Sequence, residues 1–225
     1  MIDVAYHPTE RRPLATRDAD LPRRLTDWLI ARGVQANAIS LSSIGFAALA
    51  ALCLVVTGSA TIVSARLLFG LAALLVQLRL LANLLDGMVA VGSRRASPLG
   101  ELYNEVPDRM ADILILVAAG FAVGATPTLG YWGALVAVLT AYLRAFGNAA
   151  GVRGLFNGPM AKPQRMATIT AACVYCACAP AGWVGALTSD GPGALDVALA
   201  LIVAGGILTA IRRLRRIALE LRGSR

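Results

Sequence analysis

Residues 83–112 read NLLDGMVAVGSRRASPLGELYNEVPDRMAD and separate two long apolar segments of the chain. They include five of the thirteen Asp and Glu residues in a 225-residue sequence that is 57% hydrophobic and 15% charged. Ionisable side chains at membrane depth are costly and usually face a polar cavity. The acidic cluster therefore predicts a functional site inside a membrane protein.

The polar and small residues of this stretch recur at helical spacing. Before the central connection, the residues on one helix face are Asn83, Asp86, Gly87 and Ala90. After it, the residues that repeat every four positions are Gly100, Asn104, Asp108 and Asp112. Two such helices can direct oxygen ligands at one volume, where glycine lets a ligand approach the backbone. Oxygen ligands without His or Cys favour a hard cation such as Mg2+ or Mn2+, which usually implies phosphate.

The composition of the whole chain predicts lipid as its solvent. The mean hydropathy of +0.67 is too high for a soluble domain of this size. Six apolar stretches approach the roughly 20 residues that a membrane-spanning helix needs. They are residues 39–58, 62–82, 113–124, 129–146, 166–183 and 197–211. We expect an all-α integral membrane protein, a bundle of six transmembrane helices.

The positively charged residues predict how the chain is oriented. They precede the first apolar stretch, follow the second, lie between the fourth and fifth, and follow the sixth. The other connections, around residues 57–61, 124–130 and 189–193, contain no Lys or Arg. This positive-inside pattern places both termini on the cytoplasmic side of the cell membrane. The net charge of +8 then reflects membrane topology, and no nucleic-acid partner is expected.

Residues 20–32, DLPRRLTDWLIAR, predict an N-terminal amphipathic helix on the inner membrane surface. Leu21, Leu25, Trp28 and Leu29 recur at helical spacing, and the arginines can contact anionic lipid headgroups. The chain then divides into a cytoplasmic N-terminal segment (1–38), a six-helix membrane domain (39–215) and a basic cytoplasmic tail (216–225).

The spacing within residues 83–108 resembles the signature of the CDP-alcohol phosphotransferase family, D-x2-D-G-x2-A-R-x8-G-x3-D-x3-D. The frame is kept without insertion, but Asn83 and Asn104 replace the first and third aspartates, and Val91 replaces the arginine. The segment QANAIS at 35–40 is similar to the family's P-N-x-I-T element. With the six-helix layout, the resemblance covers most of the chain and indicates a variant branch of the family.

The resemblance implies transfer of a phosphatidyl group from CDP-diacylglycerol to the hydroxyl of a small alcohol, phosphorylated or not, with release of CMP. It implies one or two Mg2+ or Mn2+ ions at Asn83, Asp86, Asn104 and Asp108, with Asp108 as the general base. Because two of the four carboxylates are replaced by amides, weaker metal binding or a single tightly held ion is expected. Similar enzymes are homodimers, so a homodimer is expected.

Further residues are candidates for contacting the substrates. Those expected to bind the CDP-lipid are Asn37, Arg79, Gly87, Ala90 and Gly100. Arg79 shares a helix face with Asn83 and Asp86, and the alternative is an ion pair with Asp86 or Asp108. Those expected to bind the acceptor are Arg144, Arg153, Lys162 and Arg165, unless these charges serve only membrane topology. The remaining acids of the motif are expected to pair with nearby arginines, and the alternative is that they tune the site. These acids are Glu101, Glu105 and Asp112, and the arginines are Arg94, Arg95 and Arg109.

The leading hypothesis is thus a membrane phosphotransferase of phospholipid biosynthesis. The alternative is a catalytically impaired relative that binds CDP-lipid or a partner without turnover, for which the two asparagines and Val91 are the support. A third reading is a small transporter, because polar residues within spans also mark permeation paths. It is weakened because the polar residues cluster near one membrane face.

Overall fold

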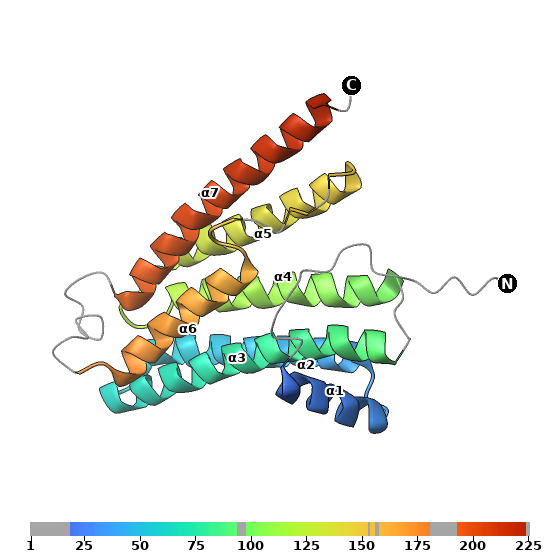
Figure 1. Ribbon diagram of the computed structural model, residues 1–225. Helices are drawn as coiled ribbons and strands as arrows, with labels where there is room; N and C mark the ends of the chain where they lie inside the picture. The colour runs from blue at the N-terminus through green and yellow to red at the C-terminus, as the bar shows by residue number, and fades with distance from the viewer. Residues whose placement is uncertain (1–18, 94–97, 153, 156–157, 181–192, 224–225) are drawn as a thin grey trace.

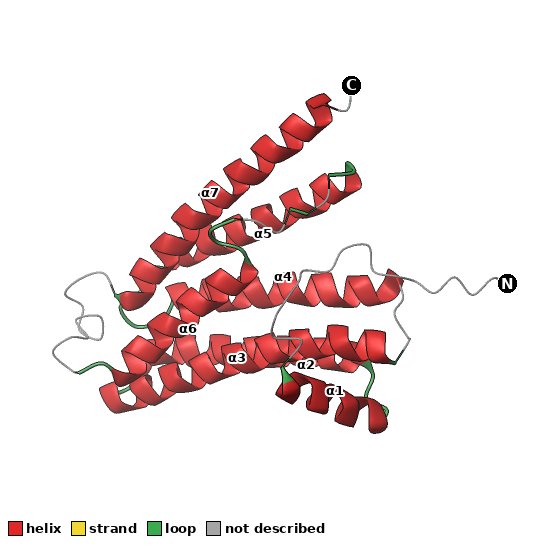
Figure 2. Ribbon diagram, viewed as in Figure 1, coloured by secondary structure: helices red, strands yellow, loops and turns green. Residues whose placement is uncertain are grey.

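The computed structural model describes residues 19–93, 98–152, 154–155, 158–180 and 193–223, of which residues 98–101 and 104 are described by their backbone alone. These residues form helices and connections, without a strand (Figures 1 and 2). The helices are α1 Asp20–Ala31, α2 Ala36–Val56, α3 Ile62–Gly92, α4 Pro98–Gly120, α5 Pro127–Ala149, α6 Lys162–Cys178 and α7 Ala194–Gly223, with a short 3-10 turn, η2 Thr57–Ser59, after α2. The all-α architecture predicted from the sequence is confirmed.

The helices that carry the acidic motif are longer than their apolar stretches. Helix α3 continues to Gly92, past the apolar stretch that ends at residue 82, and α4 begins at Pro98, before the apolar stretch that begins at residue 113. Each added turn pairs backbone N–H and C=O groups that would otherwise need another partner. Because the helices are continuous, Asn83 and Asp86 lie on α3, and Asp108 and Asp112 lie on α4.

Four helical segments are long and apolar enough to cross a membrane, as expected of an integral membrane protein. They are Ala36–Ser59, Ile62–Gly92, Pro127–Ala149 and Ala194–Gly223. Large apolar side chains on their outer faces, such as Leu67, Leu74 and Leu135, are exposed, which suits contact with lipid. Helix α4 is polar in its first half, and α6 has Lys162 and Arg165 in its first turn. The six-span count therefore stays a prediction.

Packing between the helices uses small side chains. Helix α2 lies along α3 and α4, α5 contacts α4 and α7, and α6 contacts α3 and α7 (Figure 1). Ala47, Ala50 and Ala72 are fully buried, so these helix backbones approach closely. At the junction of α4 and α5, a Cβ added to Gly130 would lie 2.8 Å from the carbonyl oxygen of Leu116 and 3.0 Å from Cα of Gly120. Only glycine fits there without displacing backbone.

The predicted amphipathic helix is present as α1, and it packs against the end of α3. Leu29 and Ile30 of α1 contact the buried cluster that contains Leu85 and Val89, whereas Trp28 remains exposed. The apolar face of α1 thus supports the α3 turns that carry the acidic motif. Its position on the membrane surface stays a prediction.

Candidate active site

A polar cluster forms where the last turns of α3 meet α4, α2 and the start of α6. Its members, all with described side chains, are Ser40 of α2, Arg79, Asn83 and Asp86 of α3, Asp108 and Asp112 of α4, and Lys162 and Arg165 of α6. The spacing in the sequence predicted that α3 and α4 would meet at these residues. The contribution of α6 comes only from the tertiary fold.

Asp108 is the centre of this cluster. Its buried carboxylate accepts hydrogen bonds from the side-chain amide of Asn83 and from the ammonium group of Lys162. Nη2 of Arg79 lies 3.4 Å from Oδ1, and Nη2 of Arg109 lies 3.7 Å from Oδ2. Two hydrogen-bond donors and two further positive charges thus converge on this one carboxylate.

Asp86 faces the same volume from α3. It is buried, and its Oδ2 accepts a hydrogen bond of 2.6 Å from the hydroxyl of Ser40 on α2. Ser40 is a site residue that the sequence reasoning missed, although it is the last residue of the QANAIS segment. The likeness of this segment to the family's P-N-x-I-T element is the sequence signal by which Ser40 can be found. Asn37 begins the same turn of α2 and is partly exposed.

Asp112 bridges two arginines inside the protein. Its Oδ1 lies 2.9 Å from Nη2 of Arg79, and its Oδ2 lies 2.8 Å from Nη2 of Arg165. The side chain of Asp112 is 1% exposed, and those of Arg79 and Arg165 are 0% and 2% exposed, so water does not screen these pairs. Asp112 was expected to pair with the arginines near the motif, but its partners in the described structure are Arg79 and Arg165. Arg109 contacts Glu105 at 3.4 Å, as expected.

Arg79 forms ion pairs, which was the alternative to binding the CDP-lipid, and two of its nitrogens remain without a partner among the described residues. Besides its contacts with both aspartates, Nη2 donates to the backbone oxygen of Asp108 at 3.2 Å. Its Nε and Nη1 are buried without a hydrogen-bond partner in the part of the chain that the structure describes. A ligand oxygen or a water molecule near this side chain would satisfy them.

The four residues expected to bind the acceptor have different surroundings. Lys162 contacts Asp108, and the half-exposed Arg144 contacts Glu105. Arg165 also donates from Nη1 to the Thr140 hydroxyl and to the Met160 carbonyl oxygen, each at 3.2 Å, and so ties α6 to α4 and α5. Arg153 lies outside the described residues.

Arg213 of α7 is a second residue that the sequence reasoning missed. The arginines after the last apolar stretch were attributed to membrane topology, yet this side chain is buried and donates to the backbone oxygen of Thr140. Arg165 contacts the hydroxyl of the same threonine. Two cations from α6 and α7 thus meet on one residue of α5. Nothing in the sequence distinguishes Arg213 from the neighbouring Arg212.

The small residues of the motif are placed as a ligand site requires where the structure describes them. A Cβ added to Gly87 would meet no atom within 4 Å, so this part of α3 leaves open space. Ala90 is partly buried one turn later. Gly100 and Asn104 belong to the backbone of α4, but their side-chain environment lies outside the described part of the structure, as do Arg94 and Arg95.

The described residues supply few oxygen ligands for a metal ion. Among them, no three His, Cys, Asp or Glu side chains gather as a metal site. Asp86 and Asp108 are the available carboxylates, and Asn83 carries an amide oxygen, which are ligands that Mg2+ and Mn2+ accept. Asp112 is occupied by two guanidinium groups. Besides Arg79, Lys162 and Arg165, the side chain of Arg109 also lies close to an acid of the cluster, 3.7 Å from Asp108.

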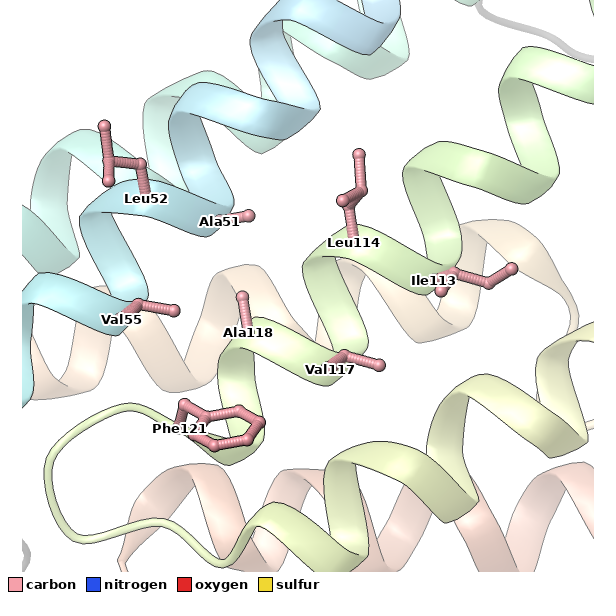
Figure 3. A pocket seen from close by; sticks show the side chains of 8 residues that line it. All are labelled: Ala51, Leu52, Val55, Ile113, Leu114, Val117, Ala118 and Phe121. Atoms are coloured by element: carbon pink, nitrogen blue, oxygen red, sulfur yellow. The ribbon is translucent and has the colours of Figure 1, made fainter.

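An apolar groove lies between α2 and α4. Its volume is about 580 Å³, and its lining on α4 runs from Ile113 to Phe121 (Figure 3). The lining side chains are Ala51, Leu52, Val55, Ile113, Leu114, Val117, Ala118 and Phe121. Because all of them are apolar, only a hydrocarbon chain or another apolar group matches this surface.

Solved structures of phosphatidylinositol phosphate synthase from Mycobacterium tuberculosis are similar to this one. The structure with CDP-DAG bound has a TM-score of 0.69 at 17% sequence identity, covering 88% of this chain and 94% of that chain. The structure in complex with manganese and citrate has a TM-score of 0.68 at 17% identity, covering 87% and 88%. The apo form has a TM-score of 0.65 at 18% identity, covering 86% and 94%.

The remaining comparisons do not extend this likeness. No family model and no curated protein matches the sequence. The structural likeness nevertheless spans most of both chains, so the chain has the fold of this membrane synthase.

Proposed function

We propose that this chain is a CDP-alcohol phosphatidyltransferase of phospholipid biosynthesis, which transfers a phosphatidyl group from CDP-diacylglycerol to a small alcohol and releases CMP. The observation that carries the proposal is the convergence of Asp86 and Asp108 from two helices at one end of the bundle. Support comes from the fold, because a similar synthase was solved with CDP-DAG bound. The motif that matches the family's signature is also the polar centre of the structure.

The chemistry assigned to Asp108 is proton removal. The acceptor hydroxyl gives its proton to this carboxylate while its oxygen forms a bond to the phosphorus that carries diacylglycerol. The bond from that phosphorus to the bridging oxygen breaks, and CMP leaves with the electron pair. Lys162 and Arg79 both contact this carboxylate and hold it in position for the transfer.

A divalent cation fits the described donors. When bound, Mg2+ or Mn2+ would neutralise the phosphate oxygens and polarise the phosphorus for attack. Asp86 and Asp108 would hold it, with the amide oxygen of Asn83. Asn104, whose side chain lies outside the described residues, is assigned to the same ion on the family signature alone. Ser40 would keep Asp86 oriented through its hydrogen bond. Support for divalent metal use is that a similar synthase was solved with manganese.

The acceptor is assigned to the basic residues near α6. Arg144 lies at the rim of the cluster, and Lys162 contacts Asp108, so an acceptor phosphate bound there would bring its hydroxyl towards the base. Arg165 holds three helices together, which favours a structural role for it. A phosphorylated alcohol is the acceptor that these cations match best. The chain would act as a homodimer in the cell membrane, with six spans and both termini in the cytoplasm.

The test is CMP release by the purified protein reconstituted in lipid vesicles. The vesicles contain CDP-diacylglycerol, Mg2+ or Mn2+ is added, and a panel of phosphorylated and unphosphorylated alcohols is supplied. Release should require metal and one class of acceptor, and Asp108→Asn should lower it about 10²-fold or more, because a general base contributes that much. Asp27→Asn on the exposed face of α1 is the matched control. Silence across the panel, with metal-dependent binding of CDP-lipid, would identify a binding protein instead.

A further inference from the structure

Lys162 is in an unusual place for a residue that only serves membrane topology. It is the first residue of α6, and its ammonium group is directed at Oδ2 of Asp108 instead of at the surrounding solvent. Its side chain is 22% exposed, and that of Asp108 is 8% exposed. An ammonium group held against a buried carboxylate occupies a position that a metal ion would otherwise take.

The negative charges of the cluster are already matched by its own side chains. Asp86, Asp108 and Asp112 contribute three negative charges, and Arg79, Lys162 and Arg165 contribute three positive charges. Arg109, 3.7 Å from Asp108, adds a positive charge that it shares with Glu105. Two divalent cations would add four positive charges to carboxylates that are already neutralised. Repulsion between these ions and the fixed cations would make such a state unfavourable where water is scarce.

Asn83 also disfavours the binding of a second divalent cation. Its side-chain amide donates a hydrogen bond to Oδ1 of Asp108, an arrangement that uses the NH2 group. A carboxylate at this position could not donate that bond, and it would repel Asp108 unless a cation lay between them. The asparagine thus lets α3 and α4 meet at Asp108 without a second metal ion.

We propose that Lys162 is a built-in cation of this site, so that the chain binds one divalent ion and that ion competes with Lys162 for Asp108. The inference deepens the proposed function and rests on the same residues. In the absence of metal, Lys162 neutralises the carboxylate and holds the start of α6 against α4. When a divalent ion binds, the ammonium group of Lys162 leaves Oδ2 of Asp108 and becomes available to an acceptor phosphate.

The competition predicts a gain of metal affinity when the lysine charge is removed. Mn2+ binding is measured by electron paramagnetic resonance and calorimetry on the reconstituted full-length protein, without CDP-lipid or acceptor. The wild-type protein should bind at most one Mn2+ per chain. Lys162→Met and Lys162→Gln should each bind Mn2+ about tenfold more tightly or better, because one positive charge in contact with the ligand carboxylate is gone. Lys162→Arg keeps the charge and should bind like the wild type.

Two further variants distinguish an effect of Lys162 at the site from an effect of the protein's overall charge. Arg212→Met removes one positive charge from an exposed position on α7 and should leave Mn2+ affinity unchanged. Asn83→Asp combined with Lys162→Met should raise the number of bound Mn2+ ions from one to two, because it supplies a carboxylate in place of an amide. Unchanged or weaker binding in both Lys162→Met and Lys162→Gln would overturn the proposal, and so would two equally tight ions in the wild type.

The outcome is distinguishable from failure of the proposed function. Mn2+ binding is measured without substrate, so it reports on Lys162 whether or not the chain turns over CDP-lipid. A protein that releases CMP but whose metal affinity ignores Lys162 would retain the proposed function and lose this inference. A protein that never releases CMP, but binds Mn2+ more tightly when Lys162 is replaced, would lose the proposed function and retain this inference.

Discussion

Ser40 of α2 donates a 2.6 Å hydrogen bond to Oδ2 of Asp86 on α3, and both residues are buried. The bond joins two helices at the residue that the proposed function uses as a metal ligand. A hydroxyl that orients a carboxylate in this way affects the affinity of the ligand for metal without touching the metal itself.

Replacing Ser40 should therefore weaken metal use specifically. In Ser40→Ala, we expect the Mn2+ concentration needed for half-maximal CMP release to rise about 10- to 100-fold, the usual cost of losing such a partner. Ser40→Thr keeps the hydroxyl and should restore much of the affinity. The control is Ser42→Ala, since the exposed Ser42 bonds only locally, to the backbone oxygen of Ile39 at 2.7 Å. An unchanged metal dependence in Ser40→Ala would show that Asp86 is held by other contacts.

Replacing Asp112 should lower the stability of the protein, because this residue pairs with two buried arginines. Asp112→Asn leaves Arg79 and Arg165 buried without their shared counter-charge, and removing one partner from buried ion pairs costs about 3–5 kcal/mol. The expected result is a large fall in the unfolding temperature of the detergent-solubilised protein. Asp27→Asn on α1 makes the same chemical change at an exposed position and should have little effect. If both variants unfold alike, water reaches the arginines in solution.

Arg144 should discriminate between acceptors. Removing a charge-assisted contact to a phosphate costs about 1.5–3 kcal/mol, so Arg144→Met should raise KM for a phosphorylated acceptor about tenfold or more. The KM for CDP-diacylglycerol should stay the same. Arg212→Met removes an equal charge from an exposed position of α7 and should change neither value. Equal effects on phosphorylated and unphosphorylated acceptors would point to a role in pairing with Glu105 alone.

The junction of α4 and α5 should reject any side chain at Gly130. In Gly130→Ala, the new Cβ would lie 2.8 Å from the Leu116 carbonyl oxygen and 3.0 Å from Cα of Gly120, so the helices must separate. Overpacking of this kind costs about 1–3 kcal/mol, which a lower unfolding temperature would report. Gly45→Ala on α2 is the control, because a Cβ there meets nothing within 4 Å. A stable Gly130→Ala variant would mean that the two helices can move apart freely.

Much of the fold was predictable because its signals are local. Apolar stretches of membrane length and the amphipathic pattern of residues 20–32 predicted the helices, and the family signature predicted the fold that the structural likeness confirms. Helix ends were less predictable. The unbroken apolar stretch ends before Asn83, whereas α3 continues to Gly92, because backbone hydrogen bonding and packing against α1 maintain the helix there.

What the sequence alone determined about this protein is its helical membrane character and the spacing that brings Asp86 and Asp108 to one volume. Only the tertiary structure decided the partner of each acid: Lys162 pairs with Asp108, Arg79 and Arg165 pair with Asp112, and Ser40 donates a hydrogen bond to Asp86. Helical periodicity reports which residues share a face, but not how each helix is rotated about its axis or which helix it meets. These partners lie 33 to 54 residues apart in the sequence, so their contacts depend on the packing of the whole bundle.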